Sequence, residues 1–110
     1  MNIGETLRSS GLALILALGA GSASQAEDQA ATVRIDNFSF TPAEITLAPG
    51  TALTWVNGDD IPHTVVATNK AFRSKALDSE QQFSFTFKEP GVYEYFCSLH
   101  PHMQGKVIVK

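Results

Sequence analysis

Residues 83–97 read FSFTFKEPGVYEYFC and contain the clearest half-buried strand pattern in the sequence. Three phenylalanines alternate with polar residues from position 83 to position 87, which is the period of a half-buried β-strand. The turn residues EPG at 89–91 follow, and a second β-rich run, VYEYFC, ends at Cys97. The stretch therefore predicts two strands joined by a tight turn.

Short apolar runs separated by turn residues continue along the rest of the chain, at 33–40, 45–47, 53–56, 65–67 and 107–109. No ten-residue stretch between them has a helical period, and residues 68–82 are typical of a surface loop. The first run is interrupted at Asp36-Asn37, which predicts a bend in that strand. This pattern predicts an all-β fold, an antiparallel Greek-key β-sandwich. The stripe Phe83, Phe85 and Phe87 is assigned to its core, beside Trp55 and Phe38.

Composition excludes several classes of protein. The chain has 110 residues, of which 44% are hydrophobic and 17% charged, so it is neither disordered, collagen-like nor a polytopic membrane protein. Its net charge of −3 argues against a nucleic-acid partner, because binding to phosphates needs a basic surface. A single cysteine rules out a disulfide within the chain.

The N-terminal segment is expected to be a secretory signal peptide spanning residues 1–26. Arg8 precedes the apolar run GLALILALGA at 11–20, and the small residues Ser24 and Ala26 suit a cleavage site. The run is about half the roughly 20 residues that span a bilayer, so no membrane span is expected in the mature chain. Cleavage would leave a single domain, residues 27–110, in the periplasm.

Metal-ligating side chains gather in residues 97–103, CSLHPHM. Cys97, His100 and Met103 stand three residues apart, and His63 begins another apolar run upstream. A thiolate, two imidazoles and a thioether are the ligands of a type 1 copper centre, which has no open position for a substrate. We therefore expect one copper ion per chain, cycling between Cu(I) and Cu(II), and an electron carrier rather than an enzyme.

Other interpretations remain open at this point. A buried cysteine and a buried methionine are often only structural, and His63 would suit an exposed turn. The same sulfur and nitrogen ligands also bind zinc, and a copper carrier or buffer would use them to hand copper to another protein. His102 is expected to be a solvated side chain, with a contact to a partner, a pH-sensitive group or an alternative metal ligand as the other possibilities.

Three segments of the sequence resemble the cupredoxins, most closely the amicyanins and their plastocyanin-like relatives. They are residues 62–65 (PHTV), 91–97 (GVYEYFC) and 97–105 (CSLHPHMQG). The two residues between His100 and Met103 are similar to the short amicyanin loop. The resemblance implies His63, Cys97 and His100 as equatorial copper ligands, Met103 as the axial ligand, a periplasmic location and an electron-shuttle role.

Two positions depart from the family pattern. Thr64 stands where relatives often have an asparagine that ties the two ligand loops together, and we expect its shorter side chain to reach Ser98 or a backbone group. His102 stands where an apolar residue is common. Around His100, the apolar residues Leu99 and Pro101, with Pro62, are predicted to form the surface on which redox proteins dock transiently with a monomeric chain.

Overall fold

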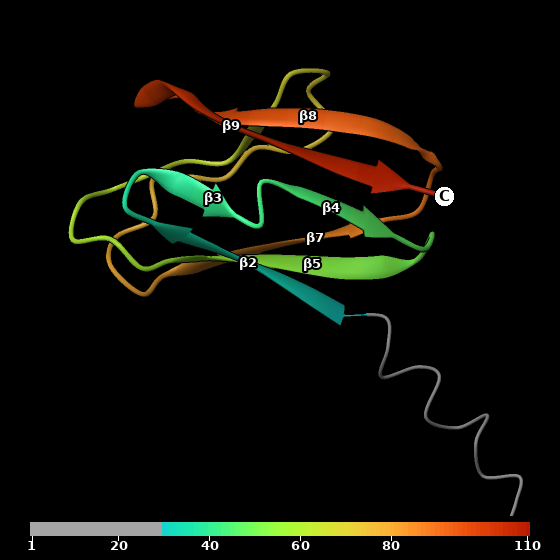
Figure 1. Ribbon diagram of the computed structural model, residues 1–110, viewed down its shortest axis with the longest axis horizontal. Coiled ribbons are helices and arrows are strands. Elements are labelled where there is room, and N and C mark those ends of the chain that lie inside the picture. Colours follow the sequence, from blue (N-terminus) through green and yellow to red (C-terminus); the bar gives the residue numbers. More distant parts are fainter. Residues whose placement is uncertain (1–29) are drawn as a thin grey trace, which may run out of the picture.

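Two four-stranded sheets make up the part of the chain that the structure describes. The structure is a computed structural model and describes residues 30–110, so the predicted signal peptide lies outside the described residues. The strands in chain order (Figure 1) are β2 (Ala30–Asp36), β3 (Ser39–Thr41), β4 (Glu44–Leu47), β5 (Thr51–Asn57), β6 (Val66–Ala67), β7 (Gln82–Phe87), β8 (Gly91–Cys97) and β9 (His100–Val109). Among the described residues, no helix is long and apolar enough to cross a bilayer.

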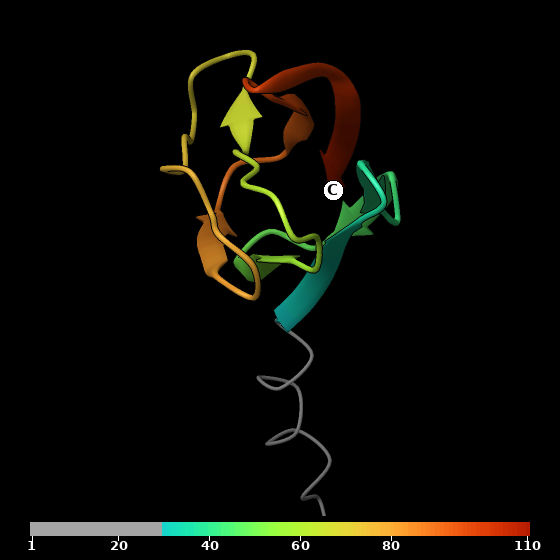
Figure 2. The same ribbon diagram turned by 90° about the vertical axis from the view of Figure 1, so that its left-hand side faces the viewer.

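The two sheets pack face to face, which confirms the predicted all-β sandwich. One sheet has the order β3-β2-β5-β7 and the other β4-β9-β8-β6, and Figure 2 shows them as two layers. The pairing is not antiparallel throughout, because β2 pairs with β5, and β4 with β9, in parallel. The chain passes through β4 in the second sheet before it returns to the first as β5, and this crossing brings β5 back in the direction of β2.

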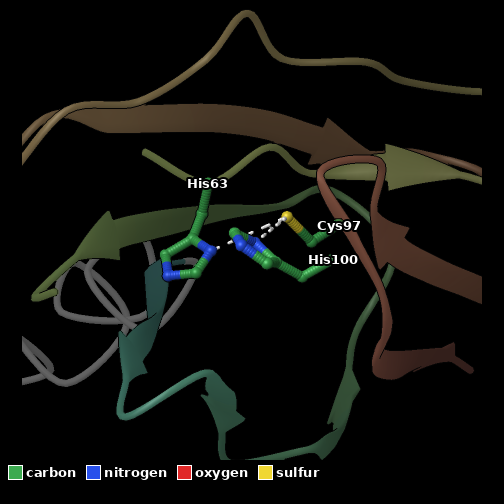
Figure 3. A group of neighbouring side chains, drawn as sticks. All are labelled: His63, Cys97 and His100. Carbon is green, nitrogen blue, oxygen red and sulfur yellow. Dashed lines mark hydrogen bonds between the residues drawn. The ribbon is translucent and has the colours of Figure 1, made fainter. Parts of the chain in front are cut away.

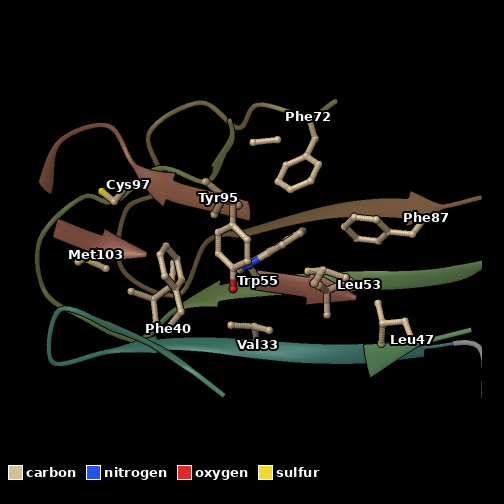
Figure 4. Close-up of a cluster of buried hydrophobic side chains, with 14 of the residues drawn as sticks. Val33, Phe40, Leu47, Leu53, Trp55, Phe72, Phe87, Tyr95, Cys97 and Met103 are labelled. Atoms are coloured by element: carbon tan, nitrogen blue, oxygen red, sulfur yellow. The ribbon is translucent and has the colours of Figure 1, made fainter. Parts of the chain in front are cut away.

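The core lies between the sheets and is centred on Trp55 of β5. Every second side chain of β5 is buried, as the β period requires. The Trp55 ring contacts the rings of Phe72, Phe83, Phe87 and Tyr95, with centroid distances of 5.3, 5.6, 6.3 and 5.4 Å. The phenylalanine stripe belongs to this core, as predicted: Phe87 is buried, and Phe83 and Phe85 are partly buried against it. Cys97 and Met103 lie at one end of the cluster, and Phe87 and Leu47 lie at the other (Figure 4).

The chain reverses where the sequence predicts only a bend. Asp36 pairs with Ser39, so Asn37 and Phe38 form a two-residue hairpin turn between β2 and β3. Their φ angles are 53° and 60°, as in the hairpin turns whose twist matches the flanking strands. Phe38 is 43% exposed, so its assignment to the core was wrong. At the tip of a hairpin the side chain lies beyond the space between the sheets.

The C-terminal strand is longer than the sequence predicts: it includes residues 107–109 and extends back to form a second hairpin with β8. Strand β9 begins at His100, and His100 pairs with Cys97 at the end of β8. Residues 68–81 are irregular, as expected, and are joined to the rest of the domain by two isolated bridges, His63 with Leu77 and Val66 with Arg73, and by further backbone hydrogen bonds to Asn57 and Glu94. The β8–β9 hairpin and the β5–β6 connection therefore carry the predicted ligands.

Candidate metal centre

The tight β8–β9 hairpin brings Cys97 and His100 together. The register of the two strands shifts between Phe96 and Cys97, and only Ser98 and Leu99 separate the two strands at the turn. The Cys97 side chain is fully buried, and its Sγ lies 3.7 Å from Nδ1 of the partly exposed His100. The three-residue spacing seen in the sequence is thus the spacing of a hairpin turn.

His63 reaches the same point from the β5–β6 connection, which Asn57 shapes. The buried Asn57 amide donates hydrogen bonds of 2.8 Å to the carbonyls of Ile61 and Leu77, and its Oδ1 accepts one of 2.9 Å from the Asp59 backbone. These bonds curl the connection back over the end of the sandwich. His63 is fully buried there, with its Nδ1 3.7 Å from Sγ of Cys97.

The three ligand atoms of His63, Cys97 and His100 all lie within 4.8 Å of one another (Figure 3). First-row metals bind sulfur at about 2.3 Å and imidazole nitrogen at about 2.0 Å, so a trigonal angle of about 120° separates the two atoms by about 3.7 Å. Both sulfur–nitrogen distances in the protein equal this value. One thiolate and two imidazoles are therefore placed to share a single metal ion.

Asp59 supports His63 from behind, and the sequence analysis missed this residue. Nε2 of His63 donates a 2.8 Å hydrogen bond to Oδ2 of Asp59. The bond holds the proton on Nε2 and leaves the Nδ1 lone pair facing the thiolate. Partial burial acts to raise the pKa of the Asp59 carboxyl, but hydrogen bonds from the Phe38 and Asn37 backbone amides and from His63 outweigh it, so the pKa lies below its ordinary value. The only signal in the sequence was an acidic residue four positions before the histidine.

Thr64 takes over the linking role expected of asparagine. Its Oγ1 accepts a 2.7 Å hydrogen bond from the Ser98 backbone amide and lies 2.8 Å from the Ser98 hydroxyl. Its own backbone amide donates to the sulfur of Cys97 over 3.3 Å. The expectation that the shorter side chain reaches Ser98 is confirmed, so the two ligand segments are tied at the sulfur itself.

The remaining predicted residues lie around this centre. Met103 is only 3% exposed and packs in the core cluster that contains Cys97. His102 points into solvent from β9. Leu99 is 51% exposed, and Pro101 and Pro62 are also exposed, so all three predicted docking residues are accessible to a partner.

Comparison with known proteins agrees with this geometry. Residues 10–109 match the family described as a cupredoxin-like domain. The chain belongs to the cupredoxin family. Amicyanin of Paracoccus versutus is 38% identical over 86 residues, covering 74% of this chain and 65% of the relative. Chloroplastic plastocyanin of Physcomitrium patens is 33% identical, covering 97% of this chain and 69% of the relative.

A solved structure links the fold to copper. A reduced Cu(I) form of an amicyanin variant superposes with a TM-score of 0.69 at 34% identity, covering 74% of this chain and 82% of that one. Buried thiolate, imidazole and thioether side chains are also the donor types that copper prefers. Copper, one ion per chain, is therefore the cofactor that this cupredoxin's donor set fits.

Proposed function

We propose that this cupredoxin is a periplasmic one-electron carrier with a type 1 copper centre. His63, Cys97 and His100 are its equatorial ligands, and Met103 is the weak axial ligand. The observation that carries the proposal is the convergence of three ligand atoms within 4.8 Å at a buried end of the sandwich. When bound, copper supplies a Cu(I)/Cu(II) couple that gains or loses one electron.

The protein's own residues would keep this exchange fast. His63 is anchored by Asp59, the Cys97 sulfur receives the Thr64 amide, and both strands of the β8–β9 hairpin belong to a sheet. Donors fixed in this way move little when the charge of the metal changes, so little reorganisation opposes electron transfer. With four protein ligands, no position is left for a substrate, which supports a carrier rather than an enzyme.

His100 is the expected point of electron entry and exit. It is the partly exposed ligand, whereas Cys97 and His63 are fully buried. The apolar rim of Leu99, Pro101 and Pro62 would exclude water where a redox partner docks near His100. The predicted signal peptide supports a periplasmic location.

The spectrum of the copper-loaded protein tests the proposal. Cu(II) added to the purified chain should give a strong thiolate-to-copper absorption band and the EPR signal of a type 1 site. Cys97→Ser should lose the band, because its oxygen cannot replace the thiolate. His102→Ala is the matched control, since it removes an exposed histidine from the other strand of the same hairpin, and it should keep the band.

Three results would argue against a type 1 electron carrier. A colourless protein that retains zinc would indicate a structural zinc site. Copper that binds without the band, and passes readily to a chelator, would indicate the copper carrier or buffer. Absorption that persists in Cys97→Ser could not come from a thiolate, because the chain has a single cysteine, and would place the metal elsewhere.

A further inference from the structure

Phe38 occupies a backbone conformation that suits a smaller residue. Its φ is 60°, in the left-handed region where the Cβ of an L-residue approaches the following carbonyl oxygen. Hairpin turns of this kind usually carry asparagine followed by glycine, and here Asn37 is followed by phenylalanine. Neither the turn nor the core requires a large ring at this position, since 43% of Phe38 is exposed. A strained residue of this kind points to a function.

The Phe38 ring contacts both candidate histidine ligands. Its centroid lies 5.5 Å from that of His63 and 5.2 Å from that of His100, with interplanar angles of 86° in both pairs. The two imidazoles are themselves 5.0 Å apart, at 63°. The three rings therefore form a closed edge-to-face triangle, an arrangement that aromatic rings favour. Phe38 is the only corner of this triangle that offers no ligand atom.

The Asp59 carboxylate fixes this turn to the metal centre. Oδ1 accepts a 2.7 Å hydrogen bond from the Asn37 amide, and Oδ2 accepts one of 3.0 Å from the Phe38 amide. The same Oδ2 accepts the 2.8 Å bond from Nε2 of His63. The ring of Phe38 and the imidazole of His63 thus share one anchor, on the side of His63 that faces away from the sulfur.

We propose that Phe38 is a positioning residue that braces the two imidazoles, so that both Nδ1 atoms stay aimed at Cys97. His63 is also held by Asp59, whereas His100 lies in a turn and is partly exposed. His100 therefore depends more on the Phe38 ring for its orientation. This inference rests on the proposed copper site for its functional meaning, but the brace itself is a property of the metal-free chain.

Three variants distinguish the effect of the Phe38 ring on the histidines from the effects of neighbouring groups. Phe38→Asn removes the ring and keeps a residue that tolerates the left-handed region, whereas Phe38→Tyr keeps the ring. Leu99→Asn is the matched control, because it removes an exposed apolar side chain next to His100 in sequence. Melting of each metal-free chain shows first that the fold is retained.

The first measurement is the NMR spectrum of the metal-free chain. The His100 ring signals should be sharp and shifted by the neighbouring ring in the unmodified chain, Phe38→Tyr and Leu99→Asn. In Phe38→Asn they should broaden and lose that shift, while the backbone amide signals away from the turn stay in place. Unchanged His100 signals in Phe38→Asn would overturn the proposal, as would equal changes in Leu99→Asn.

The second measurement is competition for copper with a chelator. Copper affinity should fall about tenfold in Phe38→Asn, the low end of what groups that orient metal ligands contribute, and the absorption band should shift. Phe38→Tyr should restore both. Unchanged affinity and spectrum in Phe38→Asn would remove the functional role. If the unmodified chain itself takes up no copper, the proposed function fails, while the NMR result still decides whether Phe38 braces the histidines.

Discussion

Thr64 is the residue that joins the two ligand segments. Its hydroxyl oxygen accepts a hydrogen bond from the Ser98 backbone amide and also contacts the Ser98 hydroxyl. Its backbone amide donates a hydrogen bond to the Cys97 sulfur. Thr64 itself is buried, with 7% of its surface exposed, so water cannot easily replace its partners. Ser98 itself is exposed, so each of its two bonds to the Thr64 hydroxyl contributes about as much as an ordinary hydrogen bond, on the order of 0.5–1.5 kcal/mol.

Thr64→Val should therefore destabilise the metal-free protein. Valine keeps the shape of threonine but leaves the Ser98 amide without its 2.7 Å acceptor. We expect the free energy of unfolding to fall by about 1–2 kcal/mol, measured by urea denaturation. Thr64→Ser retains the hydroxyl and should recover most of the loss. Equal stability of the valine variant and the unmodified chain would show that the link between the segments contributes nothing.

Among single residues, the sequence predicted the proposed ligands and the link from Thr64 to Ser98, but neither Asp59 nor Phe38. Cys97, His100 and Met103 were visible because ligand types cluster at a regular spacing, and His63 because few histidines compete for the role. Asp59 and Phe38 were missed, since their roles depend on a hairpin and a loop meeting at one carboxylate. The sequence pattern of the hairpin alone, or of the loop alone, gives no sign that the two meet at Asp59.

Among the elements, the β8–β9 hairpin depends on one close approach. Gly105 of β9 pairs with Tyr95 of β8, and a Cβ at position 105 would collide with the Tyr95 ring and hydroxyl. Tyr95 is 1% exposed and packs on Phe40 and Trp55, so a shift of its ring would disturb the core. Burial also raises the pKa of its phenol to about 12.

Gly105→Ala should therefore strain the hairpin that carries three of the four proposed ligands, Cys97, His100 and Met103. Overpacking of this kind typically costs about 1–3 kcal/mol, and we expect a loss in that range in the free energy of unfolding of the metal-free chain. Gln104→Ala, at the exposed neighbouring position, should change it by less than about 0.5 kcal/mol. If both variants unfold alike, the Tyr95 ring is free to shift and the contact does not constrain the hairpin.

The sequence predicted the kind of element better than the connections between elements. The alternation of apolar and polar residues predicted the strands of the sandwich, because one side of each strand faces the core. The phenylalanine stripe of β7 is an example. The two parallel pairs were not visible, because a strand's own pattern does not record its neighbour. The sequence predicts only a bend near Asn37-Phe38, because phenylalanine is unusual where such turns favour glycine.

For the molecule as a whole, metal binding should be coupled to folding. The donor atoms come from the β5–β6 connection and from the β8–β9 hairpin, which an unfolded chain does not hold together. A ligand that binds only the folded state at 100 times its Kd stabilises it by about 2.7 kcal/mol. For a domain of this size that corresponds to a rise of roughly 10–20 °C in Tm.

Calorimetry with and without copper measures this coupling. Copper should raise the Tm of the unmodified chain, and removal of copper by a chelator should reverse the rise. Cys97→Ser should show little or no rise, whatever its Tm without metal. A similar rise in both proteins would mean that copper stabilises the fold from a site that does not include Cys97.

Electron exchange between two copies of the protein tests the proposed docking surface. Leu99→Glu places a charge on the apolar rim beside His100, where it must be desolvated in each encounter, and it adds to a net charge that is already −3. We expect self-exchange to slow at least tenfold, measured by NMR line broadening in mixtures of oxidised and reduced protein, with an unchanged copper spectrum. The rim of one copy would meet the rim of another, so each encounter buries the charge twice.

Val92→Glu separates this local effect from the effect of total charge. Val92 is 59% exposed and lies near the start of β8, whereas Cys97 ends that strand, so the added charge is the same but far from the rim. It should slow self-exchange only through general repulsion, an effect that moderate salt screens. The slowing by Leu99→Glu should persist in salt, because desolvation of a buried charge is not screened. If salt restores both variants equally, repulsion accounts for the whole effect, and electrons do not pass through the rim around His100.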